Sequence, residues 1–186
     1  MTSRHVLGLV ALTLLLVTAC GGSGSSGDTG PRDESPAPGS VGRELPFRVI
    51  ASEKTWPPNF FEIAQDDVAV RIAADQKVFR ELWGTFGLQA EPGTPEPSWD
   101  QSVALFLAVG ESSSCPLTVK GVRFDAASRR LIVRVGLQRE LGEGEACTAD
   151  LGPRTFVLEV PRSLLHEDWQ EVQVVGVSRN PVIPIS

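Results

Sequence analysis

The chain contains very little histidine, and this restricts the chemistry that it can perform. Two histidines occur, His5 and His166, and only His166 lies beyond the apolar N-terminal segment. A Cys-x-x-Cys pair, a Gly-x-Ser-x-Gly turn and a phosphate-binding glycine loop are also missing from the sequence. Nucleophilic catalysis needs a nucleophile, a base and a group that orients the base. We therefore expect a protein that is not an enzyme and that has no catalytic residues, no metal ligands and no cofactor.

Positive charge is scarce as well. Lysine and arginine together number 17 against 23 aspartates and glutamates, which gives a net charge of −6. A protein that binds nucleic acid neutralises phosphates with clustered basic side chains. This balance predicts that nucleic acid is not a partner.

The N-terminal apolar run is short. It comprises the 12 residues 6–17, interrupted only by Gly8 and Thr13. A helix of that length spans about 18 Å, whereas the hydrocarbon core of a bilayer is about 30 Å thick. With Arg4 ahead of it, the run matches the apolar region of a signal peptide better than a membrane span.

The residues after this run predict a lipid anchor. Val17, Thr18 and Ala19 directly precede Cys20, and this sequence resembles the bacterial lipobox. The resemblance implies a diacylglyceryl group on the Cys20 thiol and cleavage just before it. Two or three acyl chains hold a protein on a membrane, whereas one chain binds only marginally. The alternative is an ordinary secretory signal in which Cys20 has no role.

We divide the chain into three parts on these grounds. Residues 1–19 are predicted to be the lipoprotein signal peptide, and residues 20–46 the lipidated cysteine with a flexible tether. Sixteen of the 26 residues from 21 to 46 are Gly, Ser or Pro, a composition that cannot bury enough apolar surface to order itself. Residues 47–186 are predicted to form the globular domain, on the extracytoplasmic face of the cell membrane.

The domain is predicted to be a β-dominated α+β unit with antiparallel hairpins and one main amphipathic helix. Asp75 suits the N-cap of that helix, whose apolar face recurs at helical spacing and comprises Val78, Phe79, Leu82, Trp83 and Phe86. Residues 102–109 are almost wholly apolar, as in a central strand covered on both faces. Further strands are expected at residues 68–73, 117–124, 131–137, 156–160 and, as the last strand, 172–177. A β-bulge at Lys120-Gly121 accounts for the change of phase between Val119 and Val122.

Two cysteines remain after Cys20. Cys115 opens one predicted strand and Cys147 lies shortly before another. Because exported thiols meet oxidants, we predict a disulfide between them. A redox pair or a metal-binding pair is the alternative, with only His166 available as a further ligand.

Some polar residues could carry chemistry. Ser112, Ser113 and Ser114 form a run, and His166 could act as a base, although a surface position suits it better. Carboxylates gather in the loop before and after Cys147, where they could bind Ca²⁺ or form a solvated acidic loop, which we prefer: Glu140, Glu143, Glu145 and Asp150.

Trp56, Phe60 and Phe61 suggest a contact with a partner. The prolines between them hold the chain extended, and aromatic anchors are common in interfaces. They are equally common as plugs at the edge of a core, and we weigh the core more heavily than the partner.

The order of segments from Val68 to Leu165 resembles the PrcB C-terminal-like domain, a family named for a lipoprotein-type subunit of a bacterial surface protease complex. The resemblance is carried by a strand followed by a helix with Phe79-Arg80-Glu81-Leu82-Trp83, the apolar strand that runs into Gly110, Leu117-Thr118-Val119-Lys120-Gly121-Val122, and Thr155-Phe156-Val157-Leu158-Glu159-Val160-Pro161. This chain has Ser113-Ser114-Cys115 where family members often carry a Gly-Gly-Tyr-like run. The family implies a non-enzymatic role in supporting or binding another extracytoplasmic protein.

These observations favour a membrane-anchored protein-interaction module, with support of a protease or envelope complex as the role that the resemblance implies. The alternative is a lipoprotein that binds a small ligand or a glycan. An interaction module would show an exposed apolar patch or a free sheet edge, and a ligand binder would show a concave pocket.

Overall fold

The computed structural model describes residues 42–89, 93–166 and 169–185, which form two β-sheets, one main helix and two short helical segments. The helices are α1 (Phe60–Ile63), α2 (Gln76–Thr85) and the 3-10 segment η1 (Arg162–His166). The strands are β1 (Arg43–Leu45), β2 (Arg48–Glu53), β3 (Val68–Ala73), β4 (Ser102–Glu111), β5 (Leu117–Asp125), β6 (Arg130–Leu137), β7 (Gly152–Pro161), β8 (Glu171–Val175) and β9 (Val182–Pro184).

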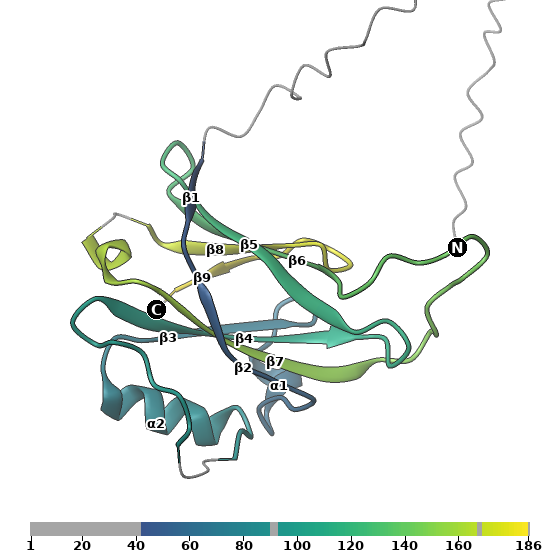
Figure 1. The fold of residues 1–186 in the computed structure, drawn as a ribbon, viewed down its shortest axis with the longest axis horizontal. Coiled ribbons are helices and arrows are strands. Elements are labelled where there is room, and N and C mark those ends of the chain that lie inside the picture. The colour runs from purple at the N-terminus through teal and green to yellow at the C-terminus, as the bar shows by residue number, and fades with distance from the viewer. Residues whose placement is uncertain (1–41, 90–92, 167–168, 186) are drawn as a thin grey trace, which may run out of the picture. The chain divides into compact units, whose positions relative to one another are not determined.

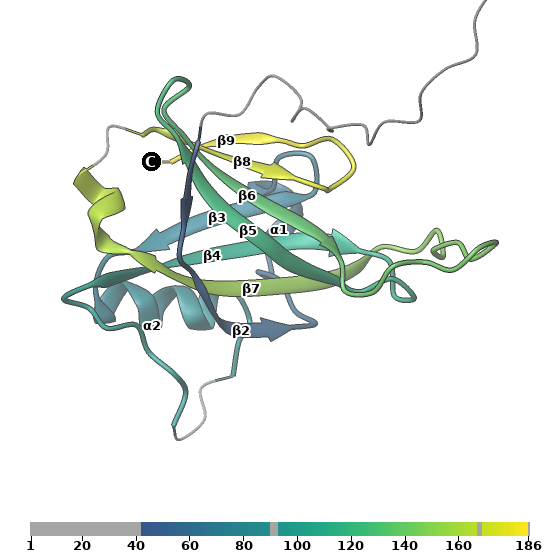
Figure 2. The same ribbon diagram turned by 45° about the horizontal axis from the view of Figure 1, so that its top comes forward.

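The strands form a sandwich of two sheets. One sheet has the order β1-β5-β6-β8-β9 and the other the order β2-β7-β4-β3. Helix α2 covers the outer face of the four-stranded sheet, so that the elements form three layers (Figures 1 and 2). The predicted β-dominated α+β fold with one main helix is confirmed.

Strand β4 shows why part of the sequence is apolar without alternation. Val103, Leu105 and Leu107 face the core between the two sheets. Ala104, Phe106 and Ala108 belong to the second core, which lies under α2. Because both faces of β4 are covered, almost every position in it is buried.

Residues next to helix α2 in the sequence determine where it begins and ends. The side chain of Asp75 accepts a hydrogen bond from the backbone N–H of Val78 at 2.9 Å, as predicted for an N-cap. Phe79 and Trp83 are buried on the sheet side of the helix. Phe86 is the C-cap, and Gly87 follows in the left-handed conformation with φ +71°.

The hairpin of β5 and β6 contains the predicted bulge. Val119 pairs with Val135 and Gly121 pairs with Arg134, so that the extra residue is Lys120. The five-stranded sheet is not wholly antiparallel, because β6 and β8 run parallel. We had predicted that the strand at residues 172–177 is the last one. This is wrong, because β9 follows β8 and pairs with it in antiparallel orientation.

The first strand forms earlier in the chain than expected. Arg43–Leu45, which we assigned to the tether, pairs with β5 as strand β1. Leu45 is buried in the core between the sheets, and this burial explains why the chain orders before residue 47. Strands β1 and β2 had no counterpart among the predicted elements.

Candidate functional site

A groove with a volume of about 760 Å³ lies along strand β2. Residues 50–55 form one wall, and Gly87, Gln89 and residues 93–95 contribute the other. Trp83 of α2 also lines it. Cavities of about 300–1,000 Å³ are typical of ligand sites. The groove is therefore large enough to hold a ligand or a segment of another chain.

Strand β2 is an edge of its sheet. It pairs with β7 on one side, and the sheet ends there within the described residues. The register slips between Val49 and Ala51, which places a bulge in the first half of the strand. Residues 51–53 then pair regularly with β7 and line the groove. An edge strand carries backbone N–H and C=O groups that have no strand partner.

The end of β2 is joined to the end of α2. The hydroxyl of Thr55 donates to the carbonyl of Phe86 at 3.3 Å, and the buried Thr155 donates to the carbonyl of Thr55 at 2.6 Å. A Cβ atom on Gly87 would lie 2.5 Å from the Thr55 hydroxyl. Both the positive φ of Gly87 and this close approach exclude a side chain there. The two walls of the groove are thus fixed relative to each other.

Trp83 also carries a buried hydrogen-bond donor. Its side chain is 5% exposed and packs against Phe79 and Phe106, with ring centroids 5.2 and 6.5 Å away. Its indole Nε1 is buried and has no hydrogen-bond partner among the residues described. The indole nitrogen only donates, and a buried donor without an acceptor costs about 1–3 kcal/mol.

The three predicted contact residues follow directly after β2. Trp56 is half-buried and stacks on Phe60, with ring centroids 4.4 Å apart and planes 8° apart. Phe60 is fully buried in the core under α2, whereas Phe61 is 70% exposed. Phe61 also meets Trp56 edge-on at 5.2 Å. The segment therefore plugs the core with Phe60 and presents Phe61 on the surface.

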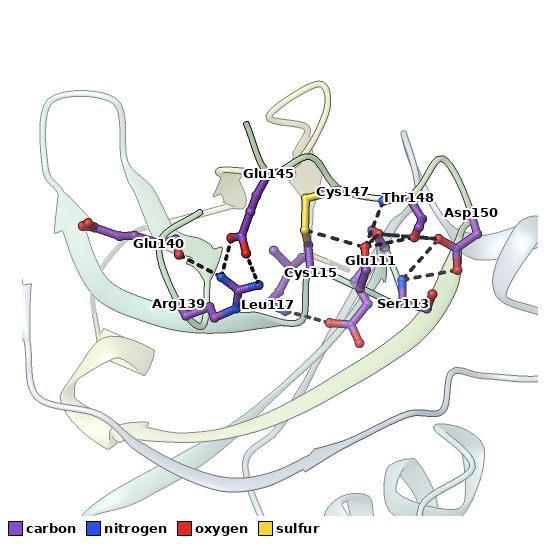
Figure 3. The surroundings of a disulfide bond; sticks show 12 residues. Glu111, Ser113, Cys115, Leu117, Arg139, Glu140, Glu145, Cys147, Thr148 and Asp150 are labelled. Atoms are coloured by element: carbon purple, nitrogen blue, oxygen red, sulfur yellow. Dashed lines mark hydrogen bonds and ion pairs between the residues drawn. A yellow bond between two sulfur atoms is a disulfide. The ribbon is translucent and has the colours of Figure 1, made fainter. Parts of the chain in front are cut away.

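Cys115 and Cys147 form a disulfide, as predicted, across a sequence separation of 32 residues. Figure 3 shows polar contacts on either side of it. On one side Arg139 donates to Glu145 at 2.6 Å, and this bond holds the pKa of the Glu145 carboxyl below its usual value. The disulfide ties the loop that joins β6 to β7 to the segment just before β5, and the contact between Arg139 and Glu145 lies within that loop.

Hydroxyl groups and one carboxylate gather on the other side of the disulfide. Ser112, Ser114 and Thr148 lie within 3.2 Å of one another through their hydroxyl oxygens. Hydrogen bonds from Ser113 and Thr148 lower the pKa of Asp150 from 3.8 to about 2. These groups are exposed and have one another as partners, so the cluster holds the loop in place.

A buried ion pair connects this end of the sandwich with β2. Arg154 contacts Glu111 at 2.7 Å, and the Glu111 side chain is only 2% exposed. The second carboxylate oxygen accepts from the backbone N–H of Leu117 at 2.8 Å. Arg154 also reaches Ser52 at 3.5 Å. The pair therefore links β4, β5 and β7 to the wall of the groove.

The other predicted residues are not brought together into a site. His166 ends η1, and its side chain lies outside the described residues. Along residues 42–89, 93–166 and 169–185, no group of three or more His, Cys, Asp or Glu side chains could hold a metal ion. Glu145 and Asp150 point to different partners, Arg139 and Thr148.

The predicted anchor at Cys20 lies outside the described residues, as do the signal peptide and most of the predicted tether. Among the described residues, no helix has both the length and the apolar character needed to cross a bilayer.

Comparisons with known proteins found no match to this chain. No family model matches it, no curated protein matches it, and no solved structure matches it. The resemblance to the PrcB C-terminal-like domain therefore stays a prediction.

Sequence reasoning missed the groove because its parts are distant in the chain. Strand β2 has a bulge that breaks the alternation of its apolar residues. Gly87, a residue type that commonly ends helices, is a local signal of a feature beside the groove.

Proposed function

We propose that the protein is a lipid-anchored module that binds another extracytoplasmic protein and has no enzymatic activity of its own. The anchor is Cys20, at the end of a signal peptide with a lipobox. The binding face comprises the groove beside β2 and the exposed ring of Phe61. The resemblance to the PrcB C-terminal-like domain supports a protease or envelope complex as the partner.

The observation that carries the proposal is the exposure of Phe61, whose ring meets that of Trp56 edge-on at 5.2 Å. A large aromatic side chain that is 70% exposed costs solvation free energy. Aromatic side chains anchor many protein interfaces, and a free sheet edge accepts a further strand. In the chain, residues 54–60 connect the edge strand to Phe61, and the proposal takes both as parts of one binding face.

Cross-linking from Phe61 tests the proposal. A photo-reactive amino acid at residue 61 of the full chain, irradiated in the intact cell envelope, is expected to give a discrete cross-linked protein. The matched control is the same amino acid at Ala126, which is exposed in the turn between β5 and β6. Equal cross-linking from both positions, or none from residue 61, would contradict a binding face at Phe61.

The anchor has its own test. Cys20→Ala is expected to abolish incorporation of labelled palmitate and to release the mature protein from the membrane fraction. If the variant still incorporates palmitate and stays in the membrane, the lipid is attached elsewhere.

The volume of the groove favours a second candidate function, the binding of a small ligand or glycan by the anchored domain. About 760 Å³ is within the range of small-molecule sites. In that case Phe61 would give no protein cross-link, and a soluble envelope glycan would protect residues 50–55 from hydrogen exchange.

A further inference from the structure

We infer that Phe61 and the acidic residues beside it in the chain form a binding face for a basic segment of the partner, which places an arginine or lysine side chain over the ring of Phe61. The inference rests on the proposed function, since it names the chemistry of the partner that meets this ring. It follows from the open ring, from the charges that follow it and from an arginine that the chain itself holds at those charges.

The ring of Phe61 is supported on one side and open on another. It meets Trp56 and Phe60 with ring centroids 5.2 and 5.4 Å away and planes inclined at 73° and 75°. Because these two rings are stacked only 4.4 Å apart, both lie on the same side of Phe61. With 70% of its side chain exposed, Phe61 has at least one ring face open to solvent. An open aromatic face attracts a cation.

The charged residues close to Phe61 in the chain are acidic. Glu62 follows it directly, and Asp66 and Asp67 form the turn before β3, whereas residues 55–67 contain no lysine or arginine. Glu62 and Asp67 are exposed and form no ion pair with a described residue. Negative charge beside an aromatic ring adds to the attraction for a cation and opposes contact with an anionic lipid surface. These charges favour a basic protein segment over the membrane.

An arginine of the chain itself lies at the same turn. The Arg179 guanidinium donates to the Asp66 carboxylate at 2.8 Å, although the two side chains are 72% and 42% exposed. This hydrogen bond, together with the charges of Asp66 and Asp67, raises the pKa of Arg179. The turn can therefore hold a guanidinium group at the surface, and Glu62 and Asp67 are left to attract a second cation.

An arginine peptide tests the inference. The probe is an acetylated and amidated peptide of alternating arginine and glycine, added at low salt to the full chain in a non-ionic detergent. The ring resonances of Phe61 are expected to shift and to saturate, while those of the buried Phe106 stay unchanged. The same peptide with citrulline in place of arginine is uncharged. It is expected to bind about tenfold more weakly, the combined value of a cation–π contact and of surface ion pairs.

Two kinds of variant separate the ring from the charges. Trifluorinated phenylalanine at residue 61 keeps the apolar surface of the ring but withdraws electron density from its face, so the peptide is expected to bind about twofold to fivefold more weakly. Glu62→Gln combined with Asp67→Asn is expected to weaken binding by a similar factor. The matched control is Glu140→Gln combined with Glu143→Gln, which removes two charges from the loop between β6 and β7 and should leave binding unchanged.

Several results would overturn the inference. Equal binding of the citrulline peptide, or tighter binding to the trifluorinated ring, would show that Phe61 makes only an apolar contact. Phosphatidylglycerol vesicles that shift the Phe61 resonances as strongly as the peptide would identify a membrane contact. Shifts that depend on protein concentration alone would identify a second copy of the chain.

Failure of the inference can be told from failure of the proposed function. A protein cross-linked through residue 61 with the same yield in the Glu62→Gln and Asp67→Asn background would leave the binding function standing and refute the role of the acidic residues. Absence of the cross-link would instead refute the proposed function.

Discussion

At the scale of single residues, Glu111 is the most deeply buried charged side chain among the residues that the structure describes, and its environment explains its position. Its two oxygens accept from Arg154 and from the backbone of Leu117, so that neither is left without a partner. A buried charge is tolerated only when it is paired in this way. Glu171 makes a similar contact with Arg130 at 2.6 Å, but its side chain is 38% exposed to solvent.

These two glutamates are expected to differ in their effect on stability. Glu111→Ala leaves the Arg154 charge buried without its partner and should lower the free energy of unfolding by about 3–5 kcal/mol. Glu171→Ala removes an exposed pair and should lower it by less than about 1 kcal/mol. Urea unfolding followed by tryptophan fluorescence measures both. Similar losses for the two variants would show that burial of the Glu111 pair does not matter.

The second prediction at this scale concerns Asp150. Hydrogen bonds from Ser113 and Thr148 lower its pKa from 3.8 to about 2. Because the pKa is lower in the folded state, the stabilising contribution of the carboxylate is complete above pH 3.8 and is lost as the pH falls toward 2. An NMR titration of the Asp150 carboxyl carbon should therefore have its midpoint near pH 2.

A variant serves as the control for Asp150. Thr148→Val removes one donor and should move the midpoint upward, toward the ordinary value of 3.8. A wild-type midpoint near 3.8 would show that the hydroxyl groups do not hold the carboxylate in solution.

At the scale of elements, the features that could be predicted are those determined by residues close together in the sequence. The N-cap at Asp75, the helix after it and the bulge in β5 are set within a few residues and were all predicted. The pairing of β6 with β8 and the position of β2 at the edge depend on residues far apart in the chain. The groove is made from β2 and the segment after α2, and so it could not be found from local patterns.

The end of α2 allows a matched test of two glycines. Gly87→Ala is expected to destabilise the fold by about 1–3 kcal/mol, because φ is +71° and the new Cβ would lie 2.5 Å from the Thr55 hydroxyl. Gly84→Ala lies within the helix with nothing within 4 Å of the new Cβ. It should stabilise the fold by about 0.5–1 kcal/mol. Thermal unfolding of both variants compares them directly, and equal effects would rule out a special role for Gly87.

At the scale of the whole molecule, the sandwich has its own core between the sheets and a second core under α2. The loop between β6 and β7 has little apolar contact and depends on the disulfide and on the polar cluster around Asp150. The fold class could be read from the sequence in part because the continuous apolar run of β4 indicates a strand that is buried on both faces.

The disulfide is expected to stabilise the whole domain. Replacing both Cys115 and Cys147 with serine removes a cross-link between residues 32 positions apart and should lower the free energy of unfolding by about 3–4 kcal/mol. Urea unfolding of the double variant measures this loss. Wild-type protein in a strong reductant should unfold like the variant, and an unchanged midpoint in both would show that the cross-link does not contribute.

Strand β1 also determines where mechanical load enters the domain. A pull on the chain before Gly42 acts first on the three residue pairs that join β1 to β5. A pull directed away from β5 would open those pairs one after another, at lower force than pairs loaded together. The chain then passes through Pro46 and Phe47 directly into β2. Tension on an anchored protein would thus reach the strand beside the groove before any other strand of that sheet, and a bound segment there would feel the strain first.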